Sequence, residues 1–446
     1  MATHDYDAVV IGAGAGGLFT AALLGHRGYR TLVVERLGKV GGRASTTEVE
    51  GFKVNDGAIV IEVGGVTQEL CEEVGAPFDI REPQPPILYR IGKKDRDVSS
   101  GGWVMMLGPL TRSGASIAKG FGAARKNDDA LPEDEISTAA WLRKYTRSSA
   151  VQGIFRNMCA SVFAVSAEEL PARVFLTYFT RKSAFKRFGF HPRGTIGLWE
   201  DIADTFVAGG GELWLDASVD RITVAPSDGP VPVVTGVEVR RRGVVEHVKA
   251  PIVVSDIGPF ATLGLLEEGA LPGEYVEFVR GRNRPCAMLA VNFASQEPLI
   301  KAQGMLSFSK TRRLAYIANF TDICPEMAPA GWHLYVGTSV PEPAVGDFDE
   351  NAELELLYAD LRDQVPGFDQ KARILSTTIT RDEWPPQRAV AGFDLPHTTP
   401  LPGLWNVGDA VKEYANGGTT ACAETARLVA DEIAVAYPRV ADTAAH

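Results

Sequence analysis

A glycine-rich turn near the start of the chain joins a short apolar segment to an apolar segment with helical character. The β-branched run at residues 9–11 predicts a strand buried in a parallel sheet, and the pattern Gly-x-Gly-x-x-Gly begins directly after it. The first glycine allows a tight turn, the second lets the backbone approach a pyrophosphate, and the last permits close packing of helix on strand. The expected binding residues of this turn are Gly12, Gly14, Ala15, Gly16 and Gly17.

A second predicted strand, at residues 30–35, ends in a carboxylate. Glu35 stands where an acidic side chain can accept hydrogen bonds from an adenosine ribose, and it disfavours a 2′-phosphate. Arg36 is also a candidate cofactor-binding residue, although its positive charge weakens the argument against a phosphate. A glycine pattern alone is equally consistent with an ordinary turn. The complete order of strand, turn, helix, strand and carboxylate therefore predicts a dinucleotide-binding unit.

The length and composition of the chain favour a compact protein with more than one core. Its 446 residues fit two domains, or one large domain with an insertion. A net charge of -11 disfavours nucleic acid as a partner. Five cysteines without a C-x-x-C pair, and histidines without ligand spacing, predict neither disulfides nor a metal site. We expect a cytoplasmic protein, because neither a signal-peptide pattern nor a transmembrane segment is predicted.

Further segments at the beginning, in the middle and at the end of the chain resemble the phytoene desaturase and amine oxidase superfamily of flavoproteins. These segments are residues 40–44, 51–58, 191–195, 208–222, 403–409 and 417–427. The resemblance implies that FAD is the cofactor. It also implies that the binding residues include Gly41, Gly42, Arg43, Gly57, Ala58, Val219, Gly408, Asp409, Gly417, Gly418 and Thr419.

Some of these residues have a direct chemical use. Asp409, at the carboxyl end of a predicted strand, can accept hydrogen bonds from ribityl hydroxyls. Gly417 and Gly418 open a helix whose N-terminal dipole can stabilise negative charge on a reduced flavin. Residues 384–394 contain no cysteine, whereas some amine oxidases of the superfamily tether FAD there, so noncovalent FAD is expected. Because no second Gly-x-Gly-x-x-Gly follows another strand, we expect oxygen or a quinone as the electron acceptor.

The resemblance implies an α/β fold in which a discontinuous, Rossmann-like FAD-binding domain carries an inserted mixed α+β substrate domain. The FAD-binding domain, a parallel sheet with helices, is expected at residues 1–95, 190–262 and 378–446. The substrate domain is expected at residues 96–189 and 263–377, with helices between residues 142 and 190. A cavity between the two domains is expected to face the flavin.

The expected reaction is hydride transfer from a largely apolar small-molecule substrate to flavin N5. Carbon–carbon dehydrogenation is the leading interpretation, an amine oxidase is the alternative, and a redox-inactive lipid-binding escort protein of the same fold is the third. Gly418 stands where monoamine oxidases carry a tyrosine of their aromatic cage, which favours the first interpretation over the second. Tyr414 and Asn416 are candidate catalytic residues because they belong to the loop expected nearest the flavin.

Two apolar segments have alternative interpretations. Residues 103–110 are suited to a substrate entrance, but core packing is the simpler explanation. The basic and aromatic run at residues 181–190 is consistent with peripheral membrane contact, for which a solvated helix face is the simpler alternative.

Overall fold

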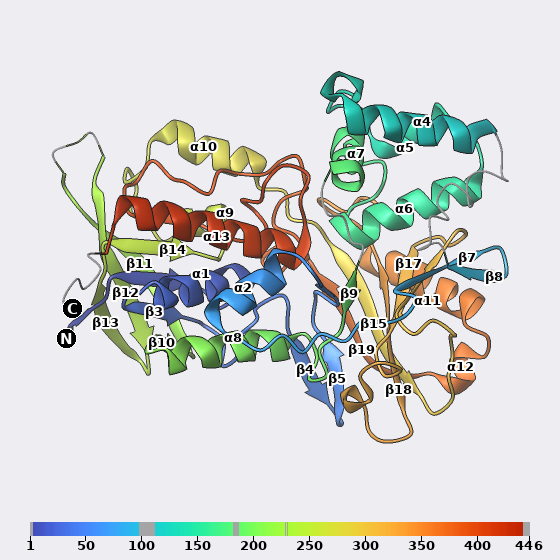
Figure 1. Cartoon of the computed structure of the whole chain (residues 1–446), viewed down its shortest axis with the longest axis horizontal. Helices are drawn as coiled ribbons and strands as arrows, with labels where there is room; N and C mark the ends of the chain where they lie inside the picture. The colour runs from blue at the N-terminus through green and yellow to red at the C-terminus, as the bar shows by residue number, and fades with distance from the viewer. Residues whose placement is uncertain (1–2, 98–111, 182–186, 228, 230, 440–446) are drawn as a thin grey trace, which may run out of the picture.

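The computed structural model describes residues 3–97, 112–181, 187–227, 229 and 231–439, and these form two packed bodies (Figure 1). One body is built on a parallel sheet with helices and the other on a mixed, mainly antiparallel sheet, so the predicted α/β fold class is confirmed. The possible entrance at 103–110 and residues 182–186 of the basic run lie outside the described residues. Within the described chain, every helix is too short or too polar to cross a bilayer.

The first body is centred on a five-stranded parallel sheet with the order β10-β3-β2-β14-β20. Its strands are β2 (Ala8–Ile11), β3 (Thr31–Val34), β10 (Glu212–Trp214), β14 (Ile252–Ser255) and β20 (Leu404–Asn406). Four of them are buried along their whole length, as their uninterrupted apolar runs predict. Segments from the start, middle and end of the chain therefore meet in one sheet.

Helices cover one face of this sheet and a second sheet covers the other (Figure 1). The helices are α1 (Ala15–His26), α2 (Val66–Val74), α8 (Ile196–Ala208) and α13 (Gly418–Ala436). The second sheet has the order β1-β13-β12-β11 and consists of β1 (Thr3–Asp5), β11 (Ala217–Ala225), β12 (Val233–Arg241) and β13 (Val244–Lys249). Successive strand side chains point to opposite faces, so Val10 packs in the core with the helices and Val9 in the core with the second sheet.

The second body contains a seven-stranded sheet with the order β19-β15-β18-β17-β16-β7-β8. Its strands are β7 (Ile87–Ile91), β8 (Lys94–Asp97), β15 (Met288–Ser295), β16 (Met305–Phe308), β17 (Leu314–Asn319), β18 (His333–Ser339) and β19 (Arg373–Thr380). On one face pack α11 (Glu350–Gln364) and α12 (Phe368–Lys371). On the other lie α4 (Arg112–Lys126), α5 (Thr138–Arg143), α6 (Ser149–Phe163) and α7 (Ala172–Arg181), which confirms the predicted helical segment.

The remaining elements are short. They are β4 (Thr46–Val49), β5 (Phe52–Asn55), β6 (Ile61–Glu62), β9 (Phe188–Gly189), α9 (Pro259–Leu263), α10 (Gly273–Arg282), and the 3-10 turns Asp128–Ala130 and Pro325–Met327. The hairpin of β4 with β5, and the pairing of β6 with β9, lie where the chain passes between the bodies (Figure 1).

Two of the predicted domain boundaries need correction. The boundary at residue 95 assigned β7 to the first body, but β7 pairs with β16 in the seven-stranded sheet. The boundary at residue 262 assigned α10 to the substrate domain, but α10 contacts α9, and its Tyr275 and Val276 pack against the core of the first body. The sheet to which a strand belongs depends on the distant strand with which it pairs. A change in local composition along the sequence does not reveal that pairing.

Candidate functional site

Three neighbouring parallel strands end together at one edge of the central sheet. In the register of the sheet, Ile11 of β2 and Asn406 of β20 both pair with Ser255 of β14. The loops after these strands therefore lie side by side, which is where open α/β sheets bind ligands. A cavity of about 1030 Å³ lies at this edge and continues toward the second body.

Most of the predicted cofactor-binding residues line this cavity. They are Gly12, Gly14, Ala15, Glu35, Arg36, Gly41, Gly42, Arg43, Gly57, Ala58, Val219, Asp409, Gly417, Gly418 and Thr419. The other three, Gly16, Gly17 and Gly408, lie immediately behind the lining. The structure thus gathers residues from both ends and the middle of the chain around one space.

The glycine turn leaves no room for side chains. Gly12 has a φ of +97°, a conformation that glycine adopts without strain, and a Cβ on Gly17 would overlap the carbonyl oxygen of Gly12. A Cβ on Gly16 would approach Oδ1 of Asp256 to 2.6 Å, and one on Gly14 would overlap the same carboxylate. The turn therefore brings bare backbone to the cavity at the N-terminus of α1, as a pyrophosphate site requires.

Glu35 is buried at the end of β3, and its carboxylate binds the backbone of the same loops. Its Oε2 accepts a hydrogen bond from the N–H of Ala13 at 2.7 Å, and its Oε1 accepts one from Leu37 at 2.8 Å. Each carboxylate oxygen has a second lone pair, so the predicted ribose contact remains compatible with these bonds. Beside it, the guanidinium of Arg36 lies 5.7 Å from the ring of Trp384, a cavity residue that the sequence did not suggest.

Arg43 and Asp409, which both line the cavity, form an ion pair. The guanidinium of Arg43 also donates to the carbonyl of Pro385 at 3.0 Å, and Oδ2 of Asp409 accepts the N–H of Arg388 at 2.6 Å. Burial alone would raise the pKa of Asp409, but the charge and hydrogen bonds of Arg43 hold it well below its usual range. Asp409 is therefore an ionised anchor for Arg43, and its contact with ribityl hydroxyls remains a prediction.

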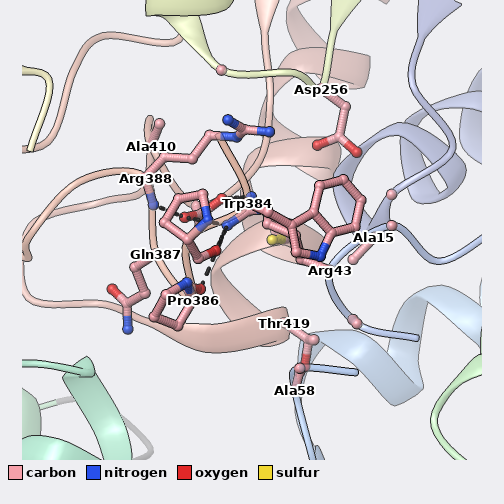
Figure 2. A pocket seen from close by; sticks show the side chains of 18 of the residues that line it. Ala15, Arg43, Ala58, Asp256, Trp384, Pro386, Gln387, Arg388, Ala410 and Thr419 are labelled. Carbon is pink, nitrogen blue, oxygen red and sulfur yellow. Dashed lines mark hydrogen bonds and ion pairs between the residues drawn. The ribbon is translucent and has the colours of Figure 1, made fainter. Parts of the chain in front are cut away.

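The charged cavity residues that sequence reasoning missed include Asp256 and Arg388. Asp256 directly follows β14, so its place after a predicted parallel strand was the available signal. Arg388 lies in the segment before β20 and points into the cavity (Figure 2), with its alkyl chain against the position that a Cβ of Gly258 would take. Its Nε is buried with no hydrogen-bond partner among the described residues, and burial lowers the pKa of the guanidinium to about 10.

The Nε of Arg388, buried without an acceptor among the described residues, makes this side chain a candidate ligand for an anion. The bare backbone at the start of α1 and the free Nε of Arg388 both fit a pyrophosphate. Across the described residues, no cluster of three His, Cys, Asp or Glu side chains is arranged to hold a metal ion.

The start of α13 forms another part of the wall. Gly417 is the N-cap of this helix, and Gly418 has a φ of +67° with open space where a Cβ would stand. Asn416 lines the cavity, and its amide donates a hydrogen bond to the carboxylate of Glu424. The helix thus directs its first backbone N–H groups and its positive dipole end toward the cavity.

The structure does not support Tyr414 as a catalytic residue. Tyr414 is absent from the described lining of the cavity, its side chain is partly exposed, and its hydroxyl donates to Oδ1 of Asp134 at 2.9 Å. Asn416 of the same loop lines the cavity, but the direction of each side chain depends on the helices packed against it. Asn416 remains a candidate because it faces the cavity.

The end of the cavity away from the glycine turn is mainly apolar and also contains two carboxylates. Its apolar residues are Val60, Val162, Tyr178, Met288, Met305 and Tyr316, and Glu62 and Glu424 line the same cavity near Tyr178. Met288, Met305 and Tyr316 belong to strands of the seven-stranded sheet, and Val162 and Tyr178 to α6 and α7. The second body therefore supplies an apolar compartment next to the polar cofactor cradle.

The parallel sheet, the glycine turn and the adjoining apolar compartment define an oxidoreductase of the α/β class. The family model for flavin containing amine oxidoreductases matches residues 15–434. An uncharacterized protein of Methanocaldococcus jannaschii is 23% identical over 409 residues, covering 90% of this chain and 93% of that protein. The neurosporene-forming phytoene desaturase of Rhodobacter capsulatus is 28% identical over 250 residues, 49% of this chain and 47% of that protein.

A solved structure of an oxidoreductase from Methanosarcina mazei has a TM-score of 0.82 and 26% identity, and covers 95% of this chain and 99% of that one. The chain belongs to the flavin containing amine oxidoreductase family, within the superfamily that also includes the phytoene desaturases. It is a flavin-dependent oxidoreductase.

Proposed function

We propose that the flavin is noncovalently bound FAD, held with its adenosine near Glu35 and Val219 and its pyrophosphate at the start of α1. The free Nε of Arg388 is the observation that carries this placement, because a dinucleotide supplies the anion that a buried guanidinium lacks. Among the described residues at the cavity the only cysteine is Cys422, and burial raises the pKa of its thiol. A protonated thiol is a poor nucleophile, which supports noncovalent binding.

The first prediction tests this attachment. Denaturing the purified yellow protein with acid or heat should release intact FAD, because no reactive cysteine faces the cofactor. The measurement is the absorbance and mass of the flavin in the supernatant after the protein is pelleted. Flavin that stays with the polypeptide would contradict noncovalent binding, and a supernatant containing FMN would contradict the choice of FAD.

We further propose that the enzyme dehydrogenates a carbon–carbon bond of a largely apolar small molecule. The apolar compartment is the observation that carries this proposal, since its side chains from both bodies suit a hydrocarbon surface. Bound FAD would accept a hydride at N5. The chain's own residues orient the substrate and exclude water, and the N-terminus of α13 stabilises negative charge at the cofactor. We propose oxygen or a quinone as the electron acceptor.

Amine oxidation is the second candidate function, and the family's description favours it. An aromatic cage needs a ring on either side of the amine, and neither Gly417 nor Gly418 supplies one. Tyr178 and Tyr316 line the apolar compartment and are the residues with which such a cage would have to be built. A redox-inactive escort protein is less well supported, because all parts of the cofactor cradle are present.

The second prediction separates the two reactions. Oxidised enzyme is mixed without oxygen with a panel of neutral polyenes and cyclic ketones and with a panel of primary amines, and bleaching of the flavin is followed. We expect faster bleaching by members of the neutral panel, because the compartment offers apolar contacts. Rapid bleaching by amines alone would reverse the ranking, and bleaching by dithionite but by neither panel would favour the escort protein.

A further inference from the structure

The carboxylate of Asp256 occupies the N-terminus of α1. It accepts a hydrogen bond from the backbone N–H of Gly17, and Cβ atoms built on Gly16 and Gly408 would lie 2.6 and 2.7 Å from its Oδ1. The side chain points into the cavity beside Ala15 and Trp384 (Figure 2). Asp256 therefore sits where the first turn of the helix presents its free N–H groups to a ligand.

An ionised Asp256 and a pyrophosphate are poorly compatible at this position. Both are anions, both require the same helix terminus, and the site is buried, where repulsion between like charges is strong. A protonated carboxyl group avoids the repulsion and gains a donor, since its O–H can hydrogen-bond to a phosphate oxygen.

The groups that face Asp256 come from four neighbouring elements. Arg43 in the loop after β3 and Arg388 before β20 are positive, and Asp409 after β20 is negative. Asp409 is already paired with Arg43, so Arg388 is the cation left to meet a ligand. Cys422 on α13 also faces this group, and burial raises the pKa of its thiol, so it contributes no charge near neutral pH.

We propose that Asp256 is a proton-donating ligand of the FAD pyrophosphate, so that binding of the cofactor takes up one proton from solvent at this side chain. The inference rests on the proposed FAD site. Burial raises the pKa of Asp256 to about 7, partly offset by the hydrogen bond from Gly17. The phosphate charge raises it further in the bound state. At pH values below this pKa, the carboxyl group of Asp256 is already neutral, and FAD binds without any free energy spent on protonation. At higher pH, Asp256 must take up a proton each time FAD binds.

The test compares FAD affinity across the range from about pH 6 to about pH 9. For the wild type, the Kd of FAD for the apoprotein, measured by flavin fluorescence, should be nearly constant below pH 7 and rise roughly tenfold per pH unit above it. Asp256→Asn keeps the size of the side chain and a donor but cannot ionise, so its Kd should not follow this slope. Glu35→Gln is the matched control, and it should weaken binding while the wild-type slope remains.

A second readout does not depend on any variant. Mixing apoprotein with FAD at about pH 8 in weak buffer with a pH indicator should show uptake of close to one proton per bound FAD in the wild type. Wild-type binding without proton uptake, or equal pH slopes for wild type and Asp256→Asn, would overturn the inference while leaving FAD as the cofactor. No FAD binding at any pH would overturn the cofactor assignment itself.

Discussion

Replacing Gly17 with alanine should abolish tight flavin binding, with a loss of affinity of roughly 100-fold. A Cβ at this position overlaps the carbonyl oxygen of Gly12, which belongs to the backbone and cannot rotate away. Either α1 moves off β2 or the turn opens, and both displace the N–H groups at the helix terminus. We also expect a loss of about 1–3 kcal/mol in the free energy of unfolding from overpacking. Flavin titration and denaturant unfolding of the variant measure the two effects.

The sign of the Gly17→Ala effect is itself informative. Alanine is intrinsically favoured over glycine within a helix by about 1 kcal/mol, so helix propensity alone would predict stabilisation. Gly122 lies within α4 and has open space at the position of its Cβ, which makes Gly122→Ala the matched control. The control should be neutral or stabilising and leave flavin binding unchanged. A Gly17→Ala protein that behaves like this control would show that the close packing at Gly12 is not required.

The second large effect is expected at the buried ion pair. Arg43→Met removes the cation beside Asp409 and leaves a buried carboxylate without its main partner, at a cost of about 3–5 kcal/mol in the free energy of unfolding. Flavin should also be lost, because Arg43 lines the cavity. The measurements are the unfolding midpoint in urea and the flavin content of the purified variant.

The pH dependence of Arg43→Met distinguishes charge from shape. Without Arg43, burial is opposed mainly by the charges of Arg388 and Lys412. We therefore expect the pKa of Asp409 to rise above its unfolded value in this variant, so that the destabilisation is relieved when the carboxylate takes up a proton. The variant should therefore be less impaired at mildly acid pH than at about pH 8. The double variant Arg43→Gln with Asp409→Asn keeps hydrogen-bonding groups but no charge, and it should recover much of the lost stability. The loss of unfolding free energy relative to the wild type could instead be equal at every pH and unchanged in the double variant. That result would mean that the packing of Arg43, rather than its charge, stabilises the site.

The cofactor cradle was predictable from sequence because its requirements are local. A tight turn with positive φ at Gly12 and close packing at Gly17 restrict the residue types at those positions, whatever surrounds them. Buried parallel strands likewise show as apolar runs, so β2 and β3 were found within a residue or two of their observed bounds.

The charges of the site were not predictable in the same way. Arg43 was expected beside the cofactor and Asp409 on a ribityl hydroxyl, but the two side chains bind each other across 366 positions of sequence. Asp256 and Arg388 belong to no glycine pattern. The order of the strands in the sheet decides which loops are neighbours, and therefore which side chains lie near these two residues. Tyr414 illustrates the same limit, since Asn416 of its loop lines the cavity while the side chain of Tyr414 turns to Asp134.

The sequence by itself determined that a glycine-rich turn joins β2 to α1, which residues form these elements, and that Glu35 follows the second strand. The tertiary structure alone decided that β7 joins the distant seven-stranded sheet and that Asp256 occupies the start of α1. It also decided that the Nε of Arg388 is buried with no hydrogen-bond partner in the described part of the chain. The physical reason is the distance along the sequence over which each effect acts. Backbone conformation and the periodicity of burial depend on a few neighbouring residues. The pairing of strands and of charges depends on which distant segments meet in space.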